Sequence, residues 1–206
     1  NDIAGNCSDL LESFVACIAA SIMIAVTISR GSFISAELLN STIMYPIWFA
    51  AAGLLSCLIG LVFASVKKMG DDPSKELNYA TWLSAGLTAV AGIFLTKYFF
   101  GAISLYSTFA LGWISPWISA VLGIISGVAI GSITEYYTSD KYRPTQQIAE
   151  VASEGEAFVI TKGDAVGSRS CLFPVLVIGI ALFVSGKICG TYGIAISALG
   201  MLSFVG

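Results

Sequence analysis

Three acidic residues and one serine near the start of the chain are the side chains best suited to chemistry. Asp9, Glu12 and Ser13 open the apolar run of residues 10–28, and Asp2 precedes it. Helical spacing places Asp2, Asp9 and Ser13 on one stripe, with Glu12 one step round from Asp9. A carboxylate inside a membrane-crossing helix costs a few kcal/mol or more, so it must face protein or water. The pattern predicts part of an ion path.

Asp9 and Glu12 lie one helical turn apart. Two carboxylates at that spacing repel each other in a low dielectric, which favours a shared proton or a bound cation. The Ser13 hydroxyl would add a third oxygen for a hard cation such as Na⁺. The alternative is that these acids pair with basic residues on neighbouring helices, which would have to lie outside this chain. No Lys or Arg falls at the centre of a predicted span.

Asp2 lies two turns before Asp9, at or above the mouth of the predicted path. It could hold Mg²⁺ beside a phosphate substrate, because Mg²⁺ is usually bound by one or two carboxylates together with phosphate oxygens. Spacing alone leaves the alternative open that Asp2 is an ordinary residue at a helix start.

The composition predicts an all-α, polytopic membrane helix bundle. Of 206 residues, 56% are hydrophobic and only 11% are charged, against roughly 25% in soluble domains. The mean hydropathy is +0.86. There is no basic field for nucleic acid, and the lack of His excludes histidine chemistry. The five cysteines show no metal-ligand spacing, and neither a phosphate-binding GxxxxGK[ST] loop nor a GxSxG motif is present.

Six apolar spans are predicted from hydropathy. They cover residues 10–29, 43–66, 80–100, 109–134, 171–187 and 191–206. Seven Lys and Arg lie in the even-numbered links and three in the odd ones, which predicts that the links at 67–79 and 135–170 are cytoplasmic. Within the link at 135–170, the QQIAEVASE portion is expected to form a short surface helix. The acidic stripe would then enter the membrane from the cytoplasm.

Small residues in the fourth and sixth spans predict close helix contacts. We expect these contacts within the bundle, with a dimerisation seam as the alternative. The residues are Gly123, Gly127 and Gly131 in one span, and Gly190, Gly193, Ser197 and Gly200 in the other. The chain also begins without Met and stops inside an apolar run, so we expect an internal piece of a larger membrane protein.

Three sequence blocks resemble one family, the membrane-bound inorganic pyrophosphatases that pump ions. They are NDIAGNCSDLLESF at 1–14, GSITEYYTSDKYRPTQQIA at 131–149, and PVLVIGIALFVSGKICGTYGIAISALGMLS at 174–203. The resemblance extends over nearly the whole chain. It implies that the chain forms about the sixth to eleventh helices of a sixteen-helix protein, and that the fragment alone is inactive.

The resemblance implies that Mg²⁺-bound pyrophosphate is hydrolysed in a cytoplasmic funnel and that hydrolysis drives H⁺ or Na⁺ outward. Asp2 resembles an active-site aspartate associated with metal-pyrophosphate and the nucleophilic water. Asp9 resembles the gate aspartate below it, with Ser13 as a neighbour. Glu12 matches a glutamate of many sodium pumps, which favours Na⁺. The resemblance further implies a homodimer, K⁺ and Na⁺ as activators, and a prokaryotic cell membrane, with an acidic-organelle membrane as the alternative.

Several residues depart from the family pattern. They are Asn6, Cys7, Leu11 and Phe14 in the first block, and the stretch at 157–169 that contains Lys162 and Asp164.

Two other classes of function are alternatives to an ion-pumping pyrophosphatase. A non-hydrolytic, cation-coupled secondary transporter or channel would also use carboxylates within the membrane. A structural scaffold leaves the three acids at the head of one span unexplained.

Overall fold

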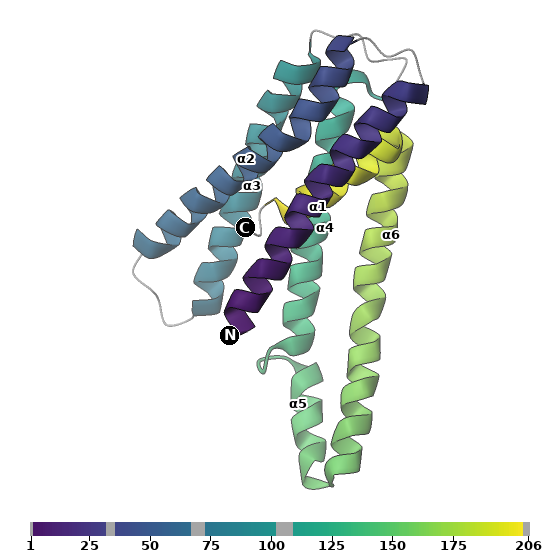
Figure 1. Ribbon diagram of the computed structural model, residues 1–206. Coiled ribbons are helices and arrows are strands. Elements are labelled where there is room, and N and C mark those ends of the chain that lie inside the picture. Colours follow the sequence, from purple (N-terminus) through teal and green to yellow (C-terminus); the bar gives the residue numbers. More distant parts are fainter. Residues whose placement is uncertain (1, 32–35, 67–72, 102–108, 204–206) are drawn as a thin grey trace. The chain divides into compact units, whose positions relative to one another are not determined.

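The computed structural model describes residues 2–31, 36–66, 73–101 and 109–203. In these ranges the structure contains helices and turns and no strand, which confirms the predicted all-α class (Figure 1). The helices are α1 (Asp2–Gly31), α2 (Ala36–Val66), α3 (Pro73–Phe100), α4 (Ser115–Thr138), α5 (Arg143–Glu150) and α6 (Glu156–Leu202), with single 3-10 turns at Gly112–Ile114 and Val151–Ser153. Five helical stretches in the described ranges are long and apolar enough to cross a membrane.

The first three predicted spans each fall within one helix. The membrane-length stretches are Ala4–Ile28, Glu37–Val66 and Asn78–Phe100. Helix α1 begins at Asp2, so the residues of the acidic stripe belong to one continuous helix. The predicted link at 67–79 and the end of the sixth predicted span fall partly on residues 67–72 and 204–206, which lie outside the described residues.

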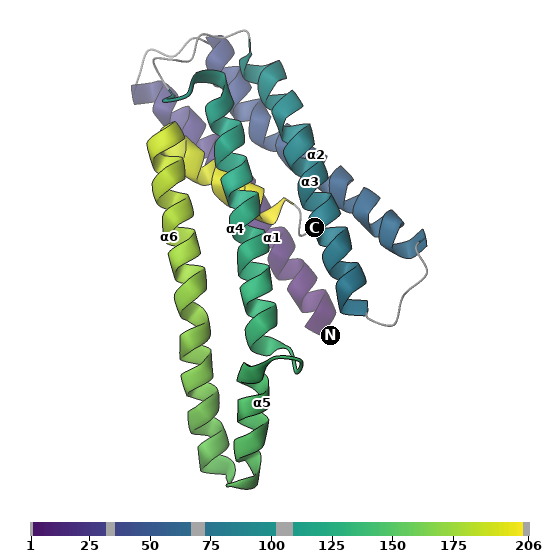
Figure 2. The ribbon, with the colours of Figure 1, turned by 180° about the vertical axis from the view of Figure 1, so that it is seen from behind.

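The fifth and sixth predicted spans lie in one element, α6, whose 47 residues contain a bend. The bend is at Gly190, with φ 62° and ψ −155°, a backbone conformation that is essentially restricted to glycine. The carbonyl of Ile188 accepts a hydrogen bond from the Ala110 N–H at 3.0 Å. Figure 2 shows the part of α6 after the bend turning away from the line of the residues just before it. The break between the two predicted spans is therefore a glycine bend and not a polar loop.

The chain divides into two compact units, described separately below. The first contains residues 1–125 and 181–206, and the second contains residues 126–180. Helices α1 to α3, the start of α4 and the end of α6 belong to the first unit. The end of α4, α5 and the start of α6 belong to the second.

Aromatic side chains with hydrogen-bonded polar tips form the core of the first unit. Tyr45 and Tyr192 are both buried. The hydroxyl oxygens of Tyr45 and Thr96 are 2.9 Å apart, and the Tyr192 hydroxyl donates to the Thr42 carbonyl at 2.9 Å. Buried tyrosines need such partners, because an unpaired hydroxyl in an apolar core is costly. Phe109 stacks on Tyr192 and links this core to the end of α6.

The predicted small-residue contacts are confirmed at three glycines. An added Cβ at Gly123 would collide with the backbone of Ser197, and one at Gly200 would collide with the backbone of Ala120. At Gly193 it would lie 2.6 Å from the Ser185 carbonyl oxygen and 2.9 Å from the Ser119 Oγ. These contacts lie within one chain, as expected, because small residues let helices approach closely. At Gly131 and Gly190 the predicted close contact is absent among the described residues, since a Cβ at either position would meet open space. Gly190 serves the bend instead.

The second unit shows that most of the polar stretch at 135–170 is helical. Helix α4 continues to Thr138, α5 spans Arg143–Glu150, and α6 begins at Glu156. The expected short helix over QQIAEVASE is confirmed as the end of α5 and the following 3-10 turn. Gly155, with φ 128°, precedes α6. Glu156 lies in the first helical turn, where its charge complements the helix dipole.

Candidate functional site

The acidic end of α1 carries the residues that sequence analysis singled out. Every residue from Ala4 to Ser13 is exposed, including Asp9, Glu12 and Ser13. Further along the same helix, Ser21 and Ala25 are buried at 0% and 3% exposure. The C-terminal half of α1 therefore packs in the bundle, while the described helices leave the acidic half uncovered.

The structure brings the predicted stripe onto one helix but does not surround it. Asp9, Glu12 and Ser13 occupy adjacent turns of α1, as the spacing predicted. The backbone of Asp2 belongs to the first turn of the same helix, and its side chain lies outside the described residues. A carboxylate at membrane depth must face protein or water, and none of the described residues covers Asp9 or Glu12.

The residues present were tested for their fit to Mg²⁺. Among the described residues, no three His, Cys, Asp or Glu side chains come close enough together to hold a metal ion. Asp2 offers one carboxylate, whereas Mg²⁺ needs near-octahedral oxygen coordination. The described residues alone therefore do not fit a complete Mg²⁺ site.

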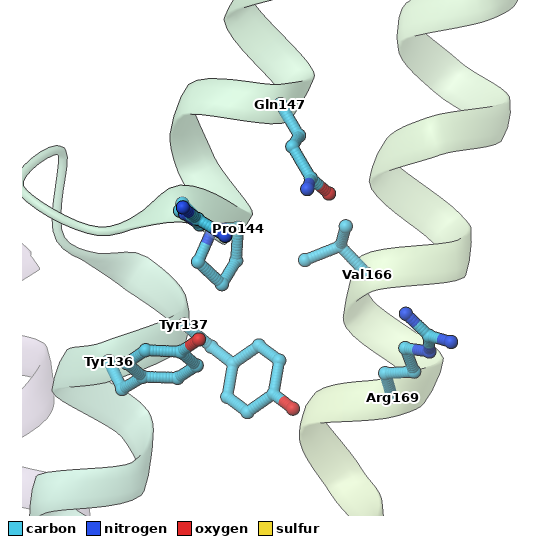
Figure 3. A pocket seen from close by; sticks show the side chains of 7 residues that line it. Tyr136, Tyr137, Pro144, Gln147, Val166 and Arg169 are labelled. Carbon is cyan, nitrogen blue, oxygen red and sulfur yellow. The ribbon is translucent and has the colours of Figure 1, made fainter.

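A pocket in the second unit was not predicted from the sequence. Its volume is about 170 Å³, and Figure 3 shows side chains from α4, α5 and α6 around it. The lining residues are Tyr136, Tyr137, Arg143, Pro144, Gln147, Val166 and Arg169. The sequence signal for this pocket is the presence of Arg143 and Arg169 in one polar stretch between two apolar spans.

Local contacts set the geometry of this pocket. Pro144 lies in the first turn of α5, where its fixed φ suits a helix start, and it is buried. The Thr145 hydroxyl donates to the Tyr137 carbonyl at 3.3 Å and ties the start of α5 to the end of α4. The rings of Tyr136 and Tyr142 are 5.2 Å apart. The turn between the two helices is thereby held against the end of α4.

A family model described as inorganic H⁺ pyrophosphatase matches residues 1–206. The chain belongs to the inorganic H⁺ pyrophosphatase family. This membership confirms the resemblance seen in the three sequence blocks. Together with the membrane-length helices, it identifies the chain as part of an integral, multi-pass membrane protein.

Three relatives similar to this chain carry the names of pyrophosphate-energized pumps. A K⁺-stimulated pyrophosphate-energized sodium pump of Thermotoga maritima is 40% identical over 96% of this chain and 29% of its own length. A putative sodium pump of the same description from Clostridium tetani is 33% identical over 99% of the chain and 28% of its length. A K⁺-insensitive pyrophosphate-energized proton pump of Methanosarcina mazei is 30% identical over 98% of this chain and 29% of its own length. The chain thus spans less than a third of the length of these pyrophosphatase relatives.

Proposed function

We propose that the full-length protein hydrolyses inorganic pyrophosphate and uses the energy to pump Na⁺ across a prokaryotic cell membrane, with H⁺ as the alternative ion. The observation that carries this proposal is the family match over residues 1–206. The preference for Na⁺ is supported by the 40% identity to a relative named as a sodium pump, against 30% to one named as a proton pump.

Helix α1 would contribute the ion path. Asp9, Glu12 and Ser13 are exposed on adjacent turns and offer carboxylate and hydroxyl oxygens to a passing cation. Two neighbouring carboxylates attract a cation or share a proton, so binding and release there would follow the charge of the site above. The rest of the full-length protein would cover this face of α1 and exclude bulk water.

Asp2 would act at the hydrolytic site, which would lie at the first turn of the same helix. Its backbone stands at the first turn of α1, two turns from Asp9. A carboxylate at this position would hold and orient the attacking water and accept a proton from it. Because α1 is a continuous helix from Asp2 onward, a displacement of its first turn would be transmitted to Asp9 and Glu12. The proposal includes Mg²⁺ as cofactor and K⁺ as activator, with their remaining ligands supplied from outside this chain. It also includes a homodimer of the full-length protein.

The test uses the full-length protein in proteoliposomes. Phosphate release from Mg-pyrophosphate and uptake of radioactive sodium are followed together, with and without a protonophore. Hydrolysis with protonophore-resistant Na⁺ uptake supports the sodium pump, while protonophore-sensitive acidification alone replaces Na⁺ by H⁺. A folded sample that releases no phosphate would contradict the proposal and favour a secondary transporter or channel.

A matched pair of variants tests the role of Glu12. Glu12→Gln removes one anionic oxygen, and we expect the Na⁺ concentration for half-maximal rate to rise about tenfold, equivalent to about 1.4 kcal/mol. Glu37→Gln is the control, because Glu37 is an exposed glutamate in the first turn of α2, away from the stripe. Equal effects of the two substitutions would show that Glu12 has no special part in ion binding.

A further inference from the structure

The pocket in the second unit has the chemistry of an anion site. Its lining combines two guanidinium groups, two phenol hydroxyls and one carboxamide with the apolar surfaces of Pro144 and Val166. None of its seven described lining residues is an Asp or Glu. Arginine presents a planar fork of N–H donors that matches the oxygens of a phosphate group. The volume of about 170 Å³ is several times the roughly 30 Å³ that one water molecule occupies in the liquid.

Three separate elements contribute the polar groups. Tyr136 and Tyr137 come from the end of α4, Gln147 from α5, and Arg169 from α6. In Figure 3, Gln147 and Arg169 extend to either side of Val166, and the Tyr137 ring reaches from α4 towards α6. Side chains far apart in the sequence thus converge on one space. The Thr145 to Tyr137 hydrogen bond and the buried Pro144 fix the start of α5 against the end of α4, while Arg143, Gln147 and Arg169 stay exposed to solvent.

The predicted span limits would place the pocket near the surface of a bilayer. The fourth predicted span ends at 134, just before Tyr136, and the fifth begins at 171, just after Arg169. Tyrosine is enriched at this depth, where the headgroup phosphates lie. Basic pockets between membrane helices on the cytoplasmic side are suited to anionic headgroups. The Lys and Arg count places this end of the helices on that side.

We propose that this pocket binds a phosphate group through Arg143 and Arg169, with Tyr137 and Gln147 as hydrogen-bond donors. The phosphate can be carried by an anionic lipid headgroup or by a free phosphate anion, and the chemistry of recognition is the same for both. If Arg143 and Arg169 each extended separately to the membrane surface, a substitution of one would not affect anion binding by the other. In the pocket the two arginines share one ligand, so each substitution weakens binding of the same group.

The first arm of the test measures lipid binding. Full-length protein in a neutral detergent is titrated with phosphatidylglycerol, and retained lipid is counted by native mass spectrometry, with phosphatidylcholine as the comparison lipid. We expect Arg143→Gln with Arg169→Gln to weaken phosphatidylglycerol binding about 100-fold, roughly tenfold for each lost charge-assisted contact. Lys162→Gln should leave it within about twofold, because Lys162 lies on α6 outside the pocket lining.

The second arm measures free anion binding. Delipidated protein is dialysed to equilibrium against radioactive orthophosphate, and the number of sites is compared between the wild type and the double variant. A loss of lipid binding alone assigns the pocket to a headgroup, and a loss of orthophosphate binding alone assigns it to the free anion. If the wild type binds neither, or if the double variant binds both as the wild type does, the proposal is overturned.

A second pair of variants keeps the test decisive if the double variant misfolds. Arg143→Lys and Arg169→Lys retain the charge but replace the fork with a single ammonium. Each should fold, as judged by size-exclusion elution and circular dichroism, and should still bind the phosphate carrier more weakly than the wild type. Unchanged affinity in both folded lysine variants would contradict recognition through the guanidinium forks.

Discussion

The acidic end of α1 and the small-residue end of α6 both interrupt apolar helices, but they differ in their exposure to solvent. Residues 4–13 of α1 are all exposed. In α6, Tyr192, Gly193 and Leu199 are buried, and so are Ser197 and Gly200. The acidic end of α1 is therefore exposed, whereas the small-residue end of α6 is buried by contacts within the chain.

The difference follows from the kind of polar group. A hydroxyl in a helix can bond to the carbonyl one turn earlier, as Ser21 does to Cys17 at 2.7 Å and Thr88 does to Ser84 at 2.8 Å. Such a side chain can be buried with a partner from its own helix, and an uncharged hydroxyl is buried at lower cost than a carboxylate even without one, as the unpaired hydroxyls of Ser119 and Ser185 show among the described residues. A carboxylate accepts but does not donate, and its charge needs a cation, a donor or water from outside its helix. Charge in a membrane helix therefore indicates function more strongly than polarity does.

The largest expected effect comes from breaking the acidic end. Asp9→Asn keeps the size of the side chain and removes the charge. We expect pyrophosphate-driven ion uptake by the full-length protein to fall about 100-fold, the lower end of the loss seen when a proton-transferring group is removed. The free energy of unfolding in detergent should change by less than about 0.5 kcal/mol, because asparagine fills the same space as aspartate and none of the described residues buries Asp9.

The control for Asp9 is Asp164→Asn, which neutralises another exposed aspartate on α6. It should leave uptake close to that of the wild type. A strong loss of stability in Asp9→Asn would mean that this carboxylate supports packing, and the contrast between the two regions would fail.

The next effect tests the packed end. Gly123→Leu on α4 forces a side chain against the backbone of Ser197, so we expect a loss of about 3 kcal/mol in unfolding free energy. Gly131→Leu is the matched control in the same helix, since a Cβ there meets open space. Denaturation of both variants in mixed micelles gives the comparison. Because leucine has the higher helix propensity, propensity alone would stabilise both variants. Similar losses in the two would therefore show that the contact between Gly123 and Ser197 is not what limits side-chain size in this helix.

The smallest expected effect concerns a single hydrogen bond at the packed end. Tyr192→Phe removes the bond to the Thr42 carbonyl at 2.9 Å while keeping the ring that stacks on Phe109. We expect a loss of about 1 kcal/mol in unfolding free energy. Tyr98→Phe serves as the control, because Tyr98 is 81% exposed. A change near zero for Tyr192→Phe would show that the bond does not contribute net stability.

Hydropathy predicted the fold class and the first three spans because long apolar runs have few other solutions in a bilayer. It did not predict that the stretch at 135–170 is largely helical, since a polar helix carries no apolar run. The buried Pro144 at the start of α5 and the positive-φ Gly155 before α6 define that region, and both act over a few residues only. The bend at Gly190 was located as a gap between spans, but its nature depends on a backbone conformation that hydropathy does not report.

The candidate site was only partly predictable. Spacing places Asp9, Glu12 and Ser13 on adjacent turns of one helix, because helical geometry is local. What covers them depends on contacts beyond the described residues, and no spacing rule supplies these. The pocket around Arg143 and Arg169 escaped detection for the same reason. Its residues meet only when α4, α5 and α6 fold back on one another.

The bend at Gly190 has a consequence for how the protein enters the membrane during synthesis. The chain changes direction within a few residues, and the Ile188 carbonyl finds its partner in the Ala110 N–H, so this irregular backbone is satisfied inside the protein. The bend leaves little polar chain for a ribosome-bound intermediate to expose on the far side of the bilayer. Cys189, at 2% exposure, is likewise withdrawn from water. The residues just before and just after Gly190 would then enter the membrane together.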